Sequence, residues 1–580
     1  MGRISDIGIR LSDRYDNMRL TASIFLLFLM QIQVYSQGTN APLNKDYYHL
    51  IDRLEIRNGK MAPIHHSAVK PYSRTAIGVF LDSTANNSNL TSTSDKFNYN
   101  YLSNDNWKWT TASENLSANP IWNTIYKHKA DFLYGEDKNE AISIHVSPIL
   151  YLSIGGESAD TKYTYINTRG IQISGMIDKK VGFYTFLAEN QMRAPLYVRD
   201  WGSEYHTVPG EGFWKGFGES GYDFFTATGY ISFNATKHIN FQFGHDRQFI
   251  GDGYRSMIMS DFSPPALFLK INTNVWRINY TNLFTQVFAD AYAQVGGSVG
   301  NTQFPKKYLV AHRLSFNIGN NVNLGVFESV VFGREDSLGN NHFELSYLNP
   351  IIFYRSIEHQ NGSLDNALIG IDAKWNFLQH FSLYGQIMFD ELKQGELINN
   401  KGWWGNKIAY QLGLKYIDVF NISNLDLQLE YNYARPYTYS HSSIYSSYAN
   451  YNQAMAHPLG ANFKEFIGII RFQPIPKLSL TGKLIIANYG LDLANSNFGK
   501  DILKDYNTRN SDEGNFTGQG IATDLIFTDF TASYMIWHNT FFDAKLLYRS
   551  QDSADVQFNQ KSTIYTVSFR WNIAQRLQEF

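Results

Sequence analysis

The 580 residues include no cysteine. This absence excludes disulfides, thiolate metal sites, a cysteine nucleophile and a lipidated N-terminal cysteine. Charged residues are also few, at 18% of the chain, where ordinary globular domains have roughly 25%. The formal net charge is −2, and lysine and arginine form no dense basic run. The sequence therefore predicts no nucleic-acid partner.

Long apolar runs are scarce as well. Residues 24–30 form an apolar stretch that follows Arg19, but it is shorter than the roughly 20 residues that a membrane-spanning helix needs. A charged residue followed by a short apolar stretch is typical of a secretory signal peptide. No later segment predicts a membrane-spanning helix.

The end of this N-terminal stretch predicts a cleavage site. Val34 and Ser36 would occupy positions minus three and minus one, so we expect cleavage between Ser36 and Gln37. Residues 1–36 are then the signal peptide. Met18 makes the better start, because the 17 residues before it have the character of an over-long gene model.

Aromatic residues are abundant, at 16% of the chain with 38 Tyr and 41 Phe, and Gly is frequent at 43. These residues suit strands whose rings lie at a lipid–water boundary. After about residue 140 the dominant period is two, and residues 369–377, 425–433 and 565–573 alternate apolar and polar side chains. Each such strand has one apolar and one polar face. Their length of about ten residues is enough to cross a bilayer at a tilt.

The connections between these strands alternate in length. Short turns are expected near residues 178, 237, 283, 320, 379, 422, 475 and 539, and long polar connections at 191–222, 249–265, 334–365, 391–405, 434–462 and 489–521. Short periplasmic turns and long external loops are the asymmetry of outer-membrane barrels. A first strand, eight hairpins and a last strand near 563–573 give about eighteen strands. We therefore predict an all-β transmembrane antiparallel β-barrel over residues 136–580, in the cell outer membrane.

The segment before the barrel, residues 37–135, predicts a periplasmic or plug-like element. A short helix is expected over residues 47–56, because its apolar positions lie on one face, with Asp46 as its cap and Gly59 at its end. Residues 82–96 are rich in Asn, Ser and Thr and predict a flexible loop.

The densest polar cluster lies at residues 244–256, where a strand gives way to a loop, and three interpretations fit it. It could be a hydrolytic His/Ser site like that of an outer-membrane phospholipase, a glycan-binding site, or an inward-facing ion-pair network that holds a loop inside the lumen. We predict no catalytic residue here. The candidate binding residues are His245, Asp246, Arg247, Asp252 and Arg255.

Two long loops carry aromatic side chains beside small polar residues, a combination that suits the faces and hydroxyl edges of sugars. The candidate glycan-facing rings are Trp201, Tyr205, Trp214, Tyr437 and Tyr445. The alternative is that these long loops pack on themselves.

Metal sites and cofactors are not predicted. The pair His65 and His66 lacks a carboxylate partner at ligand spacing, and the acidic run 511–515 is expected to be a solvated loop.

Several segments resemble the Wzi capsule-assembly family: 244–253 (GHDRQFIGDG), 260–265 (SDFSPP), 365–372 (DNALIGID), 383–386 (LYGQ) and Asp390-Glu391. Residues 456–465 (AHPLGANFKE), 46–53 (DYYHLIDR) and 70–72 (KPY) are similar to its Bacteroidetes branch, which includes gliding motility protein RemB. The resemblance implies an eighteen-stranded outer-membrane barrel that attaches capsular or exopolysaccharide without turnover. For the RemB-like branch it implies a surface part in gliding motility.

The expected partners are therefore outer-membrane lipid and either surface polysaccharide or the gliding machinery. Two other functions stay open at this point. A diffusion porin would have an open lumen lined by separated acidic and basic residues. An outer-membrane hydrolase would need a nucleophile hydrogen-bonded to a base in an exposed pocket.

Overall fold

The structure is a computed structural model. It describes residues 38–62, 66–84, 90–111, 115–118, 120–122, 124–290, 304–333, 343–350, 365–399, 401–493 and 495–580. The predicted signal peptide, its cleavage site at Ser36 and Gln37, and His65 lie outside these residues.

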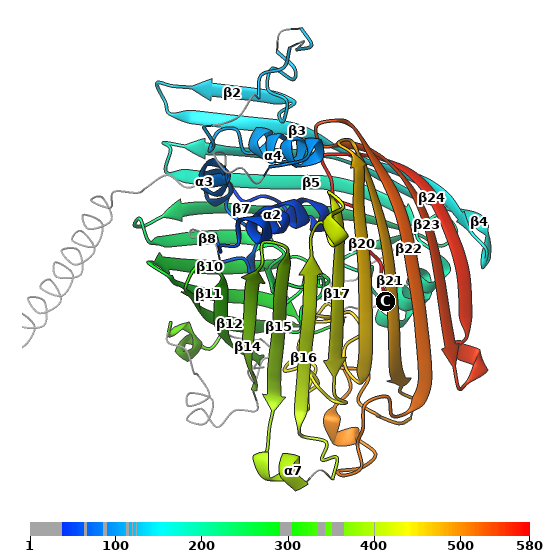
Figure 1. The fold of residues 1–580 in the computed structure, drawn as a ribbon. Helices are drawn as coiled ribbons and strands as arrows, with labels where there is room; N and C mark the ends of the chain where they lie inside the picture. Colours follow the sequence, from blue (N-terminus) through cyan, green and yellow to red (C-terminus); the bar gives the residue numbers. More distant parts are fainter. Residues whose placement is uncertain are drawn as a thin grey trace, which may run out of the picture.

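Eighteen antiparallel strands form the wall of one closed barrel, which confirms the predicted fold class and strand number (Figure 1). The last wall strand closes the sheet by pairing with the first, with Trp571 opposite Leu150 and Ile564 opposite Glu157. Two short strands, β2 (Leu133–Asp137) and β6 (Lys215–Phe217), pair with β3 and β7. The wall strands are β3 (Ile142–Glu157), β4 (Asp160–Ile177), β5 (Val181–Arg193), β7 (Gly221–Asn234), β8 (Ile239–Asp246), β10 (Ala266–Val275), β11 (Ile278–Phe288), β12 (Lys306–Ile318), β13 (Val322–Phe332), β14 (Asn366–Phe377), β15 (Phe381–Glu391), β16 (Lys407–Tyr416), β17 (Leu425–Ala434), β20 (Phe463–Ile475), β21 (Leu478–Leu491), β22 (Ile521–Trp537), β23 (Thr540–Ser553) and β24 (Gln560–Trp571).

The two faces of the wall reverse the arrangement of a soluble sheet. Along β17, Asp426, Gln428 and Glu430 are buried, whereas the leucines between them are half exposed. Along β24, Val567 is 54% exposed while its neighbour Ser568 is buried. Because apolar side chains point outward and polar ones fill the lumen, this wall matches a bilayer and not water.

Seven of the eight predicted short turns lie where strands join at one end of the barrel, and one prediction is wrong. The turn expected near residue 283 lies at Trp276 and Arg277, between β10 and β11. Trp276 adopts a positive φ of 55° there. Neither turn residue is Gly, Pro, Asn or Asp, so this turn carried none of the usual sequence signals.

Three helices of the N-terminal segment lie at the short-turn mouth of the barrel: α2 (Lys45–Asn58), α3 (Arg74–Thr84) and α4 (Thr93–Asp105) (Figure 1). The N-cap of α2 is Asn44 and not Asp46, since the Asn44 side chain accepts from the amides of Asp46 and Tyr47. Gly59 ends α2 in the left-handed conformation, at φ 61°, as glycine allows. No helix in the described part of the chain is long and apolar enough to cross a membrane.

The loop predicted over residues 82–96 is largely helical where it is described. Its first residues end α3, and Ser92 starts α4 with a reciprocal capping box to Asp95. Serine and aspartate favour helix starts as well as loops, which explains the error. Residues 85–89 lie outside the described chain.

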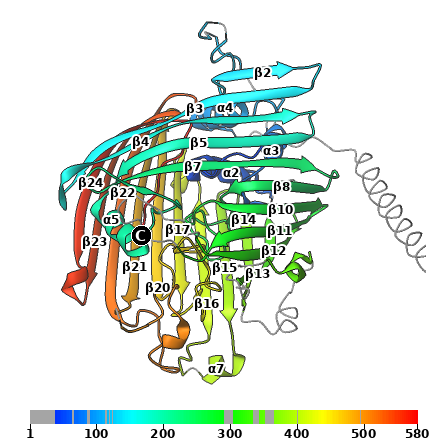
Figure 2. The same cartoon turned by 180° about the vertical axis from the view of Figure 1, so that it is seen from behind.

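The long connections lie at the opposite end, and several turn back into the barrel. They include α5 (Leu196–Tyr205), α7 (Gln394–Asn399) and the 3-10 turns η1 (Leu345–Leu348), η3 (Tyr506–Thr508) and η4 (Val556–Phe558), while η2 (Val419–Asn421) is a short turn. Inside the lumen, β1 (Val69–Lys70) pairs with β9 (Phe249–Ile250), and β18 (Ala449–Asn450) pairs with β19 (Gln453–Ala454). Both views place the C-terminal end within the barrel (Figures 1 and 2).

Candidate functional site

The polar cluster at residues 244–256 divides between the two faces of the wall. Asp246 faces the lumen at the end of β8, but His245 is exposed on the outer face, next in line after Phe243. His245 therefore does not join the other four candidates, because strand alternation sends adjacent side chains to opposite faces. Within the described residues, the cluster contains no serine–histidine hydrogen bond, since Ser256 Oγ donates to the Ile250 carbonyl at 2.5 Å.

The rest of the cluster tethers an inward loop, as the structural interpretation expects. Asp252 accepts from Ser67 Oγ at 2.7 Å and lies 3.6 Å from the Lys374 ammonium. Arg247 donates to the Gly210 carbonyl and lies 3.4 Å from Glu211. These side chains are engaged with the protein itself.

Arg255 joins the inward loop to the wall and to the C-terminal tail, residues 572–580. Its guanidinium lies 3.5 Å from Glu465 of β20 and 3.7 Å from Glu579, and it donates to the Glu579 carbonyl at 2.6 Å. Glu579 also pairs with Lys483 and accepts from Tyr254 Oη at 2.6 Å. Burial alone would raise the pKa of Glu579, but Lys483 and Arg255 lower it to about 2.

The N-terminal helix α2 is fixed at the short-turn mouth by buried ion pairs. Arg53 pairs with Asp418 and Asp426 of the wall and lies 3.2 Å from Asp95 of α4. Burial alone would lower the pKa of Arg53, but Asp426 and Asp418 raise it above its ordinary value. The guanidinium therefore stays charged and holds the helix to the wall.

A second set of ion pairs lies on another side of α2, formed by residues close to Arg53 in sequence. Lys374 of β14 is 2.5 Å from Glu55, and Lys415 of β16 is 2.6 Å from Asp52. Burial alone would raise the pKa of Asp52, but Lys415 and Lys374 hold it well below its ordinary value. Since helical positions three apart share one face, Asp52 and Glu55 meet the same part of the wall.

The lumen is therefore closed by more segments than the sequence predicted. The N-terminal element contributes as expected, and the loop 249–265 is held inside as one interpretation of the polar cluster expected. The loop 434–462 and the C-terminal tail were not expected to do so. Tyr439 and Tyr448 donate to the carbonyls of Met257 and Ile258 at 2.7 and 2.8 Å, which joins the two loops. Of the long connection predicted at 334–365, the structure describes only residues 343–350 and residue 365.

The resemblance motif at residues 456–465 is internal. His457 is fully buried and its Nε2 lies 2.7 Å from Glu465. Asn462 donates to the carbonyls of Gly490 and Gln519 at 3.1 and 2.8 Å. This motif therefore holds the inward loop in place, and its side chains are buried except for Pro458 and Lys464.

The predicted glycan-facing rings differ in exposure. Tyr437 is 1% exposed and cannot meet an external sugar, so that candidate is wrong. Trp201, Tyr205, Trp214 and Tyr445 are half-buried. Trp201 packs against Tyr205 and Phe580, at ring distances of 4.8 and 5.2 Å. Self-packing, the alternative interpretation, accounts for these contacts.

An aromatic platform, which was not predicted from the sequence, joins the two loops 391–407 and 491–521. Trp403, Trp404 and Tyr506 are half-buried there, and the Arg509 guanidinium lies 4.1 Å above the Trp404 ring. Backbone hydrogen bonds join the loops, from Trp404 to Asp512 at 2.9 Å. The run Gly-Trp-Trp-Gly at 402–405 was the signal that could have found it.

Where they are described, the residues considered as metal ligands make other contacts. His66 Nδ1 lies 2.8 Å from Ser315 Oγ and 3.0 Å from Asn323 Nδ2. Asp512 of the acidic run lies 2.6 Å from Arg509 instead. Among the residues that the structure describes, no three His, Asp or Glu side chains gather as metal ligands would.

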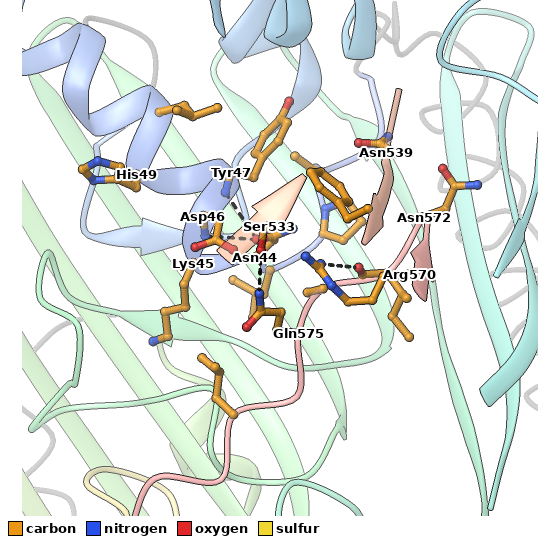
Figure 3. Close-up of a pocket in the computed structure, with 18 of the residues that line it drawn as sticks. Asn44, Lys45, Asp46, Tyr47, His49, Ser533, Asn539, Arg570, Asn572 and Gln575 are labelled. Carbon is orange, nitrogen blue, oxygen red and sulfur yellow. Dashed lines mark hydrogen bonds between the residues drawn. The ribbon is translucent and has the colours of Figure 1, made fainter. Parts of the chain in front are cut away.

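A chamber of about 490 Å³ remains in the lumen. It is lined by the start of α2, by the inner faces of the wall strands and by the C-terminal tail. Figure 3 shows the residues at the start of α2 together with Ser533 of β22, Arg570 of β24, and Asn572 and Gln575 of the tail. Gln575 Nε2 donates to Ser533 Oγ at 3.4 Å. The chamber reaches the short-turn mouth, because Pro476, Lys477 and Asn539 also line it.

Comparison with known proteins gives a family and a fold. The sequence model of the family described as capsule assembly protein Wzi matches residues 158–473, more than half of the chain. No curated protein matches the sequence significantly. A solved structure of Escherichia coli Wzi, described as an outer membrane protein involved in group 1 capsule assembly and as a carbohydrate binding β-barrel, has 13% identity and a TM-score of 0.56. That match covers 93% of this chain and 100% of that one.

Two further solved structures match with lower TM-scores. Pseudomonas aeruginosa OprD has 12% identity and a TM-score of 0.40, covering 73% of this chain and 94% of that one. Acinetobacter baumannii OccAB2 has 8% identity and a TM-score of 0.40, covering 74% and 98%. At these TM-scores the likeness carries no argument. The closed wall with its apolar outer face and the matched family together identify the chain as an outer-membrane β-barrel that belongs to the Wzi family of capsule assembly proteins.

Proposed function

We propose that this protein retains polysaccharide at the cell surface during capsule assembly, without catalysing a reaction. The observation that carries the proposal is the filled lumen, in which the N-terminal element, two inward loops and the C-terminal tail pack against one another. A barrel filled in this way suits the holding of a ligand better than free diffusion of a solute. Family membership and the carbohydrate binding described for E. coli Wzi support the same function.

The aromatic platform is the surface that we assign to this role. Indole rings beside cationic and hydroxyl side chains suit the apolar faces and hydroxyl edges of sugars. Trp403 and Trp404 supply the rings, and Arg509 and Tyr506 supply the polar groups. Phe516, which is 64% exposed, extends the platform on the same loop as Tyr506.

Retention of the host's own surface polysaccharide by the purified full-length barrel tests this proposal. We expect the intact protein to retain it, and the double variant Trp403→Ala, Trp404→Ala to lose at least about tenfold in affinity. Trp122→Ala is the matched control, because Trp122 is an equally large exposed ring outside the platform. Equal retention by the double variant and the wild type would remove the platform from the proposal.

Single-channel conductance in planar bilayers separates this function from a diffusion porin. We expect a silent barrel without added polysaccharide, because the described lumen is packed with side chains. A large, steady conductance would favour the porin and count against retention.

A surface part in gliding motility is a second candidate. Its support is the resemblance of residues 46–53 and 456–465 to the RemB branch. Deletion of the gene in a gliding host would separate the two functions, since retention predicts loss of surface polysaccharide and gliding predicts loss of movement with the polysaccharide intact.

A further inference from the structure

The lumenal chamber has polar groups that the protein itself leaves unused. The side chains of Gln172, Ser174, Ser479 and Thr481 line it and make no hydrogen bond within the described chain. They project from β4 and β21, on opposite flanks of the closing strands β22, β23, β24 and β3. A polar wall with free hydroxyls and amides suits a ligand that is itself rich in hydroxyl groups.

Arg471 of β20 adds a guanidinium with spare donors. Its cross-strand partner is Asp426, but the Asp426 carboxylate is taken by Arg53 and by His49 Nε2 at 2.9 Å. Arg471 Nη1 donates to Gln428 at 3.1 Å, while the buried Nε has no partner among the described residues. No carboxylate oxygen of a described residue lies within 4.0 Å of a nitrogen of the Arg471 guanidinium, so Arg471 forms no ion pair among these residues.

Asp46 supplies the complementary group. It lies in the first turn of α2, lines the same chamber, and its carboxylate has neither an ion pair nor a hydrogen bond in the described structure (Figure 3). A sugar hydroxyl both donates and accepts hydrogen bonds, so recognition of neighbouring hydroxyls needs a free donor and a free acceptor. Arg471 and Asp46 are such a pair.

Aromatic rings complete the lining. Tyr47, Trp107, Trp109 and Phe541 all border the chamber. Ring faces of this kind pack on the apolar face of a sugar. The volume of about 490 Å³ also lies within the roughly 300–1,000 Å³ of sites that hold small ligands.

We propose that this chamber is a second saccharide site, which takes a short saccharide segment from the periplasmic end of the barrel. The inference rests on the proposed function for its ligand class, but it uses a different surface, because the chamber opens toward the short turns and the aromatic platform lies on the long loops. The short-turn end of an outer-membrane barrel faces the periplasm.

Calorimetry on the purified full-length barrel tests the site, with short oligosaccharides from partial hydrolysis of the host's surface polysaccharide as the probe. We expect the wild type to bind, Arg471→Gln to weaken binding at least tenfold, and Thr481→Phe, which fills the chamber, to abolish it. The controls are Arg277→Gln, an exposed guanidinium at the same mouth, and Leu484→Phe, on the outward face of the same strand.

The outcomes separate this site from the platform. If the double variant at Trp403 and Trp404 loses long polysaccharide but still binds the short probe, both assignments stand. Absence of short-probe binding to the wild type, or unchanged binding to Thr481→Phe in a correctly folded barrel, would overturn the chamber site. If the wild type then still retains long polysaccharide, the proposed function stands. If it neither binds the short probe nor retains long polysaccharide, both the chamber site and the proposed function are excluded.

Discussion

The two ends of the lumen are closed by different kinds of contact. At the short-turn end, charged residues of α2 pair with charged residues of the wall, such as Arg53 with Asp418 and Asp426. At the long-loop end, the loops 249–265 and 434–462 meet through apolar side chains and tyrosine hydroxyls that donate to backbone carbonyls. Ion pairs fix the position of a helix whose backbone hydrogen bonds are made within the helix, whereas loops without regular structure need packing to order them.

The largest effect is expected at the short-turn end. Arg53→Met removes the guanidinium from the buried Asp426, which keeps His49 and the Asp418 amide as neighbours but no arginine in an ion pair. Breaking a buried ion pair from one side costs about 3–5 kcal/mol, so we expect α2 to detach and to become sensitive to protease. Arg277→Met removes an exposed guanidinium and is the control. A protease-resistant Arg53→Met protein would show that ion pairs do not hold this closure.

At the long-loop end, Phe580→Ala tests the packing closure. Phe580 is 7% exposed and its ring lies 5.2 to 5.9 Å from those of Trp201, Tyr197 and Phe262. Loss of a buried phenylalanine costs about 3 kcal/mol or more. In Phe580→Ala, amide hydrogen exchange of residues 249–265 should become faster than in the wild type, because the packing that orders this loop is weakened.

The same variant tests whether Phe580, together with the aromatic stripe at residues 565–571, guides insertion of the barrel into the membrane. The ring packs in the lumen, so we expect the yield of inserted Phe580→Ala to be normal. A lowered yield with unchanged exchange would restore the insertion role.

The barrel wall between the two ends is expected to be sensitive to charged side chains on its outer face. Val567 is on the outer face of β24, and a lysine there costs about 2–4 kcal/mol at the bilayer midplane. We therefore expect Val567→Lys to lower the yield of inserted barrel, and Phe569→Lys to do the same. Thr566→Lys, on the lumen face, should have a smaller effect. Normal yield of both outward variants would mean that the faces of β24 are assigned wrongly.

Acid should weaken the C-terminal tail through Glu579. Its pKa in the folded protein is about 2, below the ordinary value of 4.5, so its contribution to stability is fully present above about pH 4.5 and is lost as the pH falls toward 2. We expect hydrogen exchange of residues 572–580, measured relative to the intrinsic exchange rate at each pH, to rise between pH 6 and pH 3. Glu579→Gln should lack this dependence, and an equal rise in that variant would place the titration elsewhere.

The smallest effect is expected at the start of α2. Asn44→Ala removes the side chain that accepts from two amides of the first turn, at a cost of about 1 kcal/mol. The melting temperature of the N-terminal element should fall slightly, and Asp46→Asn should leave it nearly unchanged because Asp46 is not the cap. The opposite ranking would show that Asp46 starts the helix.

Much of the wall was predictable from the sequence because each strand is a local pattern. Alternation in segments such as 425–433 fixes both the strand and its two faces, and Gly, Asn, Asp or Pro marks five of the eight short turns. The turn at Trp276 and Arg277 escaped because the positive φ of Trp276 is imposed by the pairing of β10 with β11 and not by its residue type.

The candidate site was less predictable. The direction of the His245 side chain depends on the register of one strand. The burial of Tyr437 depends on a loop some 60 residues away, where the Asn497 carbonyl accepts a hydrogen bond from the Tyr437 hydroxyl at 2.8 Å. Neither feature can be recognised from the residues next to it in the sequence. The platform at Trp403 and Trp404 did leave one, in the flanking glycines.

The sequence by itself determined an outer-membrane barrel of eighteen strands with a helix before it, because period, strand length and turn residues are properties of short segments. Only the tertiary structure decided how the lumen is closed, since Arg53, Arg255, Glu579 and the inward loops meet partners that lie tens to hundreds of residues away. Such contacts depend on closure of the sheet, which brings distant strands around one axis. The contacts that close the lumen leave one chamber open, in which Arg471 and Asp46 keep free hydrogen-bonding groups.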